Sequence, residues 1–196
     1  MRKPKDYDNV QPFGEYEPLE LGGHILRIVK VEETVSRNGK DMVVIYLDTD
    51  KSDRQPLYFK QRYDDDTREN KKWGCTVYQL VEDSRTGGTN PGLVTFHTAV
   101  EKSNDGFKVV WGDKYCECFK NMLIGGVFGR EQYINQNGKA VFATKCFWFR
   151  SVETIKRGVD VPEDRLLPLD RFPANAAVSS AYSDFEEVGS DDDYPF

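Results

Sequence analysis

The stretch that decides the fold is residues 25–48, ILRIVKVEETVSRNGKDMVVIYLD. It holds two runs rich in β-branched residues, joined by Asn38-Gly39, a dipeptide typical of the tight turn of a β-hairpin. We therefore expect a first strand from Ile25 to Val35 and a return strand from Met42 to Asp48.

Three further strands are expected outward from this hairpin. Leu57 to Tyr63, LYFKQRY, alternates and predicts a third strand, with Tyr58, Lys60 and Arg62 on one face and Leu57, Phe59 and Gln61 on the other. Leu123–Tyr133 and Lys139–Arg150 flank a second hairpin signal, Asn137-Gly138, and predict the last two strands. Glycines inside the first of these indicate sharp bending or the close approach of another backbone.

Helices are expected between and after these strands. A short one is predicted near Val77–Val81, within a long excursion over residues 64–89. Asn90-Pro91 resembles a helix N-cap followed by proline, and apolar spacing from Leu93 to Val100 predicts one helix face, ended by residues 104–106. A last short helix is expected from Val152 to Arg157.

The predicted order is three strands, one main helix and two strands. This order favours a mainly β architecture, the OB-fold, a small and partly open five-stranded β-barrel with its main helix between strands 3 and 4. A generic α+β domain with an antiparallel sheet would give the same order. We expect an N-terminal arm (1–18), an OB-fold domain (19–168), a flexible Ala/Ser-rich linker (169–190) and an acidic tip (191–196).

Charge is distributed unevenly along the chain. The 196 residues include 27 Lys and Arg and 33 Asp and Glu, for a net charge of −6. Residues 171–196 hold one basic and six acidic residues, so they carry −5 and the rest of the chain only −1. A neutral body with an acidic tail is typical of an interaction tail.

The last six residues, DDDYPF, indicate a docking element. The terminal Phe ring and the free carboxylate would fit an apolar socket with Lys or Arg at its mouth, and the aspartates would steer the tip to a basic surface. The expected partner-binding residues are Asp191, Asp192, Asp193, Tyr194, Pro195 and Phe196.

This ending resembles the acidic tip of bacterial-type single-stranded DNA-binding proteins. The body is similar to such proteins from phages and mobile elements of Gram-positive bacteria, in KKWG (71–74), TAVEKSNDGFK (98–108), LIGGVFGREQY (123–133) and FRSVETIKRG (149–158). The resemblance implies an OB-fold that coats single-stranded DNA and a tip that recruits replication, recombination and repair proteins. A homo-oligomer is one expectation, although the opening strand and the lack of a long Gly/Gln-rich linker differ from the housekeeping type, usually a homotetramer.

Sequence-tolerant DNA binding needs aromatic rings for the bases and Lys or Arg for the phosphates. We expect Phe128 and Arg130 to share a face, and Trp148 and Arg150 to share one with Phe142, although an aromatic on a sheet is more often part of the core. The predicted DNA-binding residues are Tyr58, Lys60, Arg62, Lys71, Lys72, Trp73, Phe128, Arg130, Trp148 and Arg150.

Two other function classes remain open. The first is a protein–protein adaptor without DNA binding of its own, and the second a nuclease using the carboxylates of residues 64–66. We expect no enzyme, because two histidines without a nucleophile motif offer little for catalysis. The four cysteines lack paired Cys-x-x-Cys spacing, so neither a metal nor a cofactor is expected. With no apolar span and no secretory signal in the sequence, we expect a cytoplasmic protein.

Overall fold

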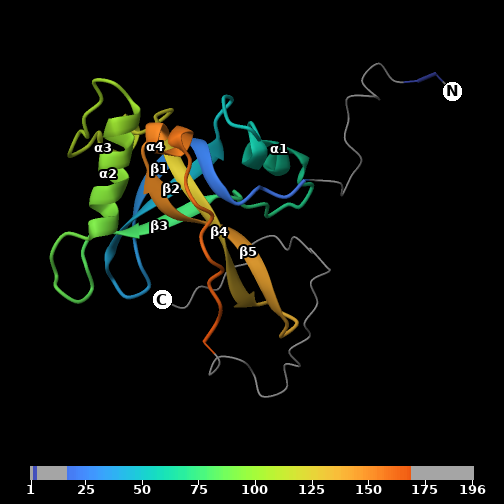
Figure 1. Ribbon diagram of the computed structural model, residues 1–196. Coiled ribbons are helices and arrows are strands. Elements are labelled where there is room, and N and C mark those ends of the chain that lie inside the picture. Colours follow the sequence, from blue (N-terminus) through green and yellow to red (C-terminus); the bar gives the residue numbers. More distant parts are fainter. Residues whose placement is uncertain (1, 4–16, 169–196) are drawn as a thin grey trace.

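The computed structural model describes residues 2–3 and 17–168, and within them one antiparallel sheet dominates (Figure 1). Its strands lie in the order β3-β2-β1-β4-β5 and the sheet is not closed, so β3 and β5 are its edges. The two predicted hairpins and the two long strands after the main helix are confirmed. The strands are β1 (Gly22–Val35), β2 (Asp41–Thr49), β3 (Thr76–Leu80), β4 (Leu123–Ile134) and β5 (Ala140–Arg150).

The main helix of the described chain is α2 (Pro91–Ser103), which follows β3 and precedes β4 as predicted. Asn90 caps it, because its side-chain oxygen accepts a hydrogen bond of 2.8 Å from the Gly92 N–H. Its apolar face packs into the core, and Phe96 is completely buried. The shorter helices are α1 (Tyr58–Asp65), α3 (Tyr115–Cys118) and α4 (Val152–Arg157).

The expected third strand, Leu57–Tyr63, is wrong, because this segment forms α1. The carboxylate of Asp48 accepts hydrogen bonds from the backbone N–H groups of Phe59 (3.0 Å) and Lys60 (3.3 Å), and so satisfies donors in the first helical turn. Pairs at i,i+4, such as Lys60 with Asp64, then join neighbouring turns. The helix also removes the predicted division of these residues between two faces of a strand.

The expected short helix near Val77–Val81 is wrong as well, because the third strand lies here. Strand β3 pairs with β2 from Met42↔Leu80 to Tyr46↔Thr76. Two β-branched residues, Thr76 and Val77, suit a strand, and pairing with the apolar edge of β2 outweighs any local helical preference. The number of strands was therefore predicted correctly, but the third was assigned to the wrong segment.

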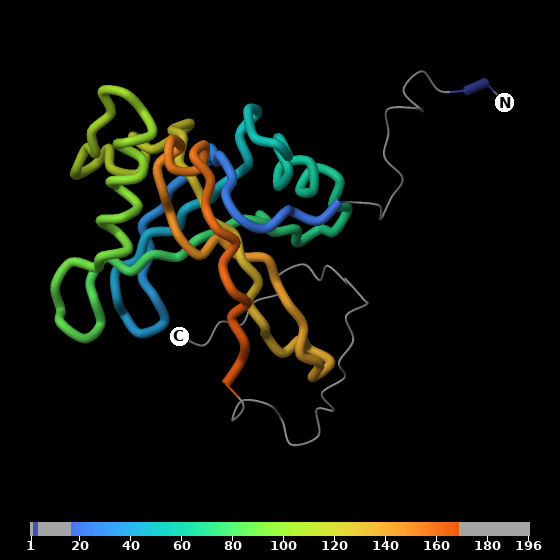
Figure 2. The backbone as a smooth tube through the Cα atoms, viewed as in Figure 1, coloured from blue at the N-terminus to red at the C-terminus, as the bar shows by residue number. Residues whose placement is uncertain are grey.

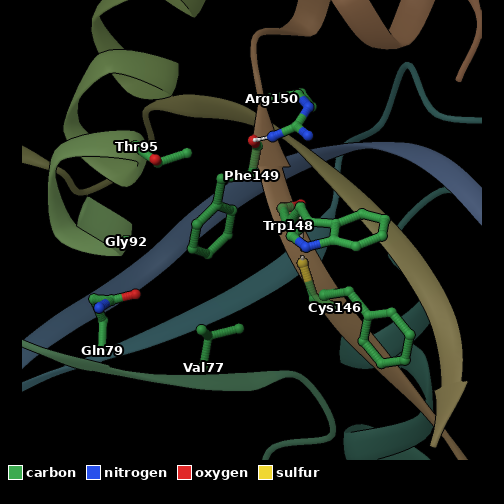
Figure 3. A pocket seen from close by; sticks show the side chains of 9 residues that line it. Val77, Gln79, Gly92, Thr95, Cys146, Trp148, Phe149 and Arg150 are labelled. Atoms are coloured by element: carbon green, nitrogen blue, oxygen red, sulfur yellow. Dashed lines mark hydrogen bonds between the residues drawn. The ribbon is translucent and has the colours of Figure 1, made fainter. Parts of the chain in front are cut away.

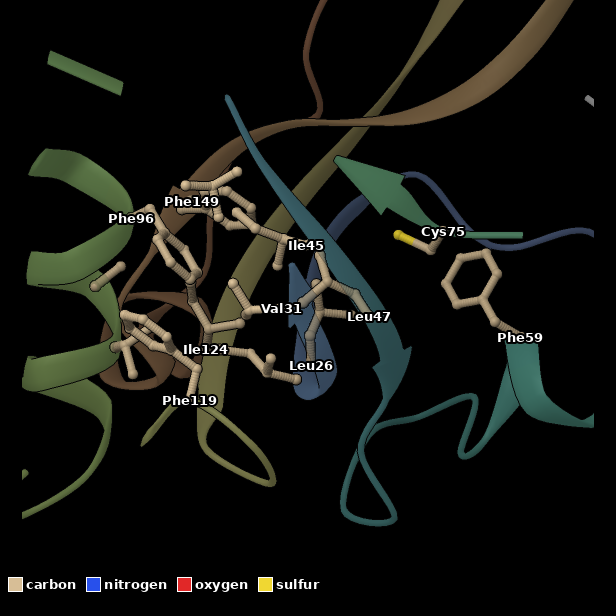
Figure 4. Packing of buried hydrophobic residues seen from close by; sticks show 14 of the residues in the cluster. Leu26, Val31, Ile45, Leu47, Phe59, Cys75, Phe96, Phe119, Ile124 and Phe149 are labelled. Carbon is tan, nitrogen blue, oxygen red and sulfur yellow. The ribbon is translucent and has the colours of Figure 1, made fainter. Parts of the chain in front are cut away.

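The core lies between one face of the sheet and α2 (Figure 4). Ile45 and Leu47 of β2 are completely buried, as are Phe96 and Phe119. The Phe96 ring lies 5.0 Å from that of Phe119 and 5.4 Å from that of Phe149, centroid to centroid. These contacts join β5 to the helical layer across the open side of the sheet.

The β4–β5 hairpin extends beyond the end of β1, which pairs with β4 only as far as Phe128. The chain after α4 runs back alongside this hairpin (Figure 2). The Arg165 N–H donates to the Arg130 carbonyl (2.9 Å) and the Gln132 N–H donates to the Arg165 carbonyl (2.8 Å). This short parallel contact occupies the β4 backbone that β1 leaves uncovered.

Candidate nucleic-acid interface

The outer face of β1, β2 and β3 carries two tyrosines that sequence reasoning missed. Tyr46 lies between Ile45 and Leu47, which both face the core, so its own side chain points outward. Tyr78 pairs with Val44, two residues from Tyr46 on the same strand, so the two tyrosines share this face. The side chain of Tyr78 is 48% exposed, which leaves ring surface open to solvent.

A charged pair from β1 surrounds the Tyr46 ring. Lys30 pairs with Tyr46 in the sheet, and its ammonium lies 5.9 Å from the ring centroid. Burial, together with the hydrogen bond to Glu32 and the negative charge of Glu32, raises the pKa of Tyr46 to about 12. The pKa of Glu32 is lowered by its hydrogen bonds with Lys30 and Tyr46. Tyr46 therefore stays a neutral aromatic ring held in place on the sheet surface.

A shallow groove of about 260 Å³ continues this face toward α1. Arg27 pairs with Asp48, which lies two residues from Tyr46 on β2, so the groove and the tyrosines are on the same side of the sheet. The volume is below the roughly 300–1,000 Å³ of small-molecule pockets. Its lining combines cationic side chains, which can contact phosphates, with one aromatic ring, which can contact a base. The lining residues are Arg27, Val29, Asp48, Thr49, Leu57, Lys60, Trp73, Lys120 and Asn121.

Two groove residues are held firmly by the fold. The Trp73 indole N–H donates to the Leu47 carbonyl at 2.6 Å, which fixes the ring over the end of β2. Arg27 contacts the Asp50 carboxylate at 2.6 Å and donates to the Asn121 carbonyl at 2.7 Å, yet its side chain remains 40% exposed. The groove thus offers positioned rather than freely moving side chains, which lowers the entropy lost on binding.

The predicted cluster of Tyr58, Lys60 and Arg62 is only partly brought to this site. Tyr58 is buried, and its hydroxyl accepts hydrogen bonds from the Leu19 N–H (3.0 Å) and the Arg62 guanidinium (2.8 Å). Tyr58 is therefore a structural residue and not a stacking platform, and the prediction for it is wrong. Lys60 lines the groove.

The predicted loop cluster Lys71, Lys72 and Trp73 is split. Trp73 lines the groove, whereas the Lys71 ammonium lies 4.5 Å from the Tyr63 ring centroid and donates to the Tyr63 carbonyl. Lys72 is exposed beside them. Only Trp73 of the three lines the groove.

The predicted platform residue Phe128 is also wrong. Its side chain is 1% exposed, stacks on Phe59 at 6.2 Å and meets the edge of His24 at 5.4 Å. It belongs to the core, the commoner role of an aromatic on a sheet. Its neighbour on the expected face, Arg130, forms a bidentate ion pair with Asp164, at 2.6 and 2.9 Å.

A β-bulge divides the face predicted for β5. Cys146 pairs with Phe128 and Trp148 pairs with Val127, so Phe147 is the extra residue. Because Val127 and Phe128 point to opposite faces, Trp148 does not share a face with Cys146 and Phe142. Sequence alternation could not reveal this shift. Trp148 (44% exposed) and Arg150 remain accessible, but at the open edge of the sheet.

This open edge contains a second pocket, of about 180 Å³, between β3, α2 and β5 (Figure 3). Val77 and Gln79 line it from β3, and Trp148 and Arg150 from β5. The Gln79 side-chain N–H donates to Asn90 Oδ1 at 3.1 Å, so β3 is joined to the start of α2 on the helix side of this pocket. Trp148 and Arg150 line this pocket and do not line the groove.

The signal for the missed residues is present in the sequence. In MVVIYLD, Tyr46 alternates with residues of the core face, and Tyr78 would have joined it if Thr76–Leu80 had been predicted as a strand. The predicted partner-binding residues 191–196 lie outside the described residues, as do the linker and most of the N-terminal arm.

No family model and no curated protein matches this chain. Within residues 2–3 and 17–168, no helix has the length and apolar character needed to cross a membrane. The same residues contain no cluster of three or more His, Cys, Asp or Glu suited to a metal ion.

Proposed function

We propose that this protein binds single-stranded DNA, largely without sequence preference, on the outer face of β1, β2 and β3 and in the groove beside it. The observation that carries the proposal is the placement of Tyr46 and Tyr78 on one sheet face next to a groove with Arg27, Lys60 and Lys120. Aromatic rings beside a cationic groove are the combination that sequence-tolerant binding requires.

The strand order supports the finer assignment of the sheet as an OB-fold. In the sheet, β1 lies between β2 and β4, and α2 lies between β3 and β4 in the chain. In this proposal, the edge strands β3 and β5 face each other across the partly open side of the barrel. OB-folds bind oligonucleotides across the face of strands 2 and 3 and the adjoining loops. The two tyrosines lie on that face of β2 and β3.

DNA binding would combine stacking of bases on aromatic rings with the replacement of carboxylates by phosphates as the partners of lysines. A base stacked on an aromatic ring contributes roughly 1–3 kcal/mol. Lys30 and Lys60 form exposed ion pairs with Glu32 and Asp64. Such pairs contribute little to stability, so phosphates can replace the carboxylates at small cost. The nearly neutral body is therefore compatible with a locally cationic groove, and affinity should fall as salt rises.

Recruitment of replication, recombination and repair proteins through residues 191–196 is a second part of the proposal. Its support is the chemistry of the sequence, where three aspartates precede Tyr194, Pro195 and Phe196. A recruiting segment separate from the DNA face would let the protein bind a partner without leaving the DNA.

The test is a fluorescence-anisotropy titration of labelled oligo-dT with the full chain at several salt concentrations. Duplex DNA of equal length is the control, and magnesium is included in one series to detect cleavage. We expect tight binding to the single strand, weaker binding as salt increases, and an intact oligonucleotide.

Absence of binding to oligo-dT at low salt would overturn the proposal and favour the adaptor. Cleavage that depends on magnesium would also overturn it, in favour of a nuclease.

A further inference from the structure

Trp111, in the loop between α2 and α3, is the most exposed large apolar side chain in the described part of the chain. It is 70% exposed, and its neighbour Val110 is 46% exposed. Neither residue belongs to the outer face of the sheet or to its groove. Tryptophan is enriched at binding interfaces, because its ring offers both an apolar face and a polar N–H.

The indole is nevertheless held in one orientation. It stacks on the Tyr115 ring, with centroids 5.4 Å apart and planes 20° from parallel, and meets the His97 ring edge-on at 5.3 Å. His97 Nε2 and the Tyr115 hydroxyl lie 2.7 Å apart in a hydrogen bond. Burial lowers the pKa of His97 and raises that of Tyr115, so both supporting rings are neutral at physiological pH. The indole is thus a pre-oriented stacking surface.

The chain connects this ring cluster to the groove. Tyr115 contacts the completely buried Phe119, with ring centroids 5.1 Å apart. Lys120, the next residue, lines the groove together with Asn121. The helix α3, of four residues, lies between Trp111 and Lys120 in the chain. The indole is thus nine residues from the groove along the chain.

We infer that Trp111 is a second base-stacking site, which extends the single-stranded DNA path beyond the groove and over α3. The inference rests on the proposed function. Residues 105–114 hold two lysines and two aspartates, so this loop has no net charge to attract phosphates or a charged peptide. Its contribution is the indole ring, and a nucleobase is the ligand that a flat, exposed and fixed ring accepts without sequence preference.

The experiment compares the full-length protein with Trp111→Ala and Trp111→Phe on a series of oligo-dT lengths covering roughly 4–16 nucleotides, the usual range for one OB-fold. Val94→Ala, an exposed apolar residue on α2, is the matched control. We expect Trp111→Ala to weaken binding of the longer oligomers by about 5- to 150-fold and to leave the shortest ones unchanged. Trp111→Phe, which keeps a ring, should retain most of the affinity.

Thermal unfolding of each variant shows that the fold is intact. Equal losses on short and long oligomers, or no loss on any, would overturn the second site while the proposed function stands. Binding of a protein ligand that depends on Trp111, with unchanged DNA binding, would overturn it as well. If the unmodified chain binds no oligomer at all, the proposed function itself fails.

Discussion

At the scale of single residues, exposure and pairing separate the binding candidates from the structural ones. Tyr58 and Phe128 are aromatic residues near basic ones in the sequence, yet both are buried. Tyr78 has no basic neighbour in sequence, yet its ring lies exposed beside Tyr46. The sequence does not contain the tertiary contacts that decide this, because they depend on which face of the sheet the core covers.

Replacing Tyr78 by alanine tests this distinction. We expect the Tyr78→Ala variant to bind oligo-dT about 5- to 150-fold more weakly, because one base loses its stacking partner. Its free energy of unfolding should change little, because the side chain is half exposed. Anisotropy titration at fixed salt measures the affinity. Val94→Ala is the control, and an unchanged affinity in Tyr78→Ala would contradict the assigned face.

His24 and Asp53 form a buried polar pair at the start of β1. His24 is completely buried, with Nδ1 2.9 Å from Asp53 Oδ1 and Nε2 2.9 Å from the Glu20 carbonyl oxygen. Although burial raises the pKa of Asp53, hydrogen bonds from His24 and from the Gln55 and Ile25 N–H groups lower it more, so the net pKa is depressed. A carboxyl group of this kind stabilises the fold in its ionised form.

This pair predicts a dependence of stability on pH. Because the folded pKa of Asp53 is below the unfolded one, its contribution is complete above about pH 4 and is lost as pH falls through the folded value. Asp53→Asn should lower the free energy of unfolding at pH 7 by about 1.5–3 kcal/mol and make its decline below pH 4 shallower. Urea titrations across this range measure both effects. Equal pH dependence in the variant and the unmodified chain would refute the assignment, and exposed Asp160→Asn serves as control.

At the scale of elements, the glycines of β4 show how closely the layers approach. A Cβ at Gly125 would lie 2.9 Å from the Arg150 carbonyl oxygen and closer still to the Ile155 side chain of α4. We expect Gly125→Ala to lower the free energy of unfolding by about 1–3 kcal/mol. Gly88→Ala is the matched control, since its Cβ would meet nothing closer than 3.6 Å. Thermal or urea unfolding compares them, and equal stability would show that α4 does not pack closely on β4.

The elements also show how much could be predicted from sequence. The Asn-Gly turns, the capped helix after Asn90 and the long strands β4 and β5 carry local signals, and all were predicted. The segments Leu57–Tyr63 and Val77–Val81 were exchanged in type. Their short patterns suit either state, and the deciding contacts, Asp48 with the first turn of α1 and β2 with β3, are distant in sequence. Because Leu57–Tyr63 is not a strand, Tyr58, Lys60 and Arg62 do not form the strand face predicted for them.

At the scale of the whole molecule, the charge asymmetry predicts competition between the tail and DNA. Residues 171–196 carry −5 and the rest of the chain −1. If the tail competes for the cationic groove, removal of residues 171–196 should raise the affinity for oligo-dT at low salt, and the difference should shrink as salt screens the charges. Anisotropy titration of both forms measures the effect. The same affinity in both forms at low salt would rule out the competition.

The central claim is that single-stranded DNA lies across the outer face of β1, β2 and β3. Ultraviolet cross-linking of the full chain to oligo-dT, followed by mass spectrometry of the cross-linked peptides, tests this most directly. The account predicts cross-links at Tyr46, Tyr78 or Trp73. Cross-links confined to the β4–β5 hairpin or to α2, with the outer face unmodified, would contradict it.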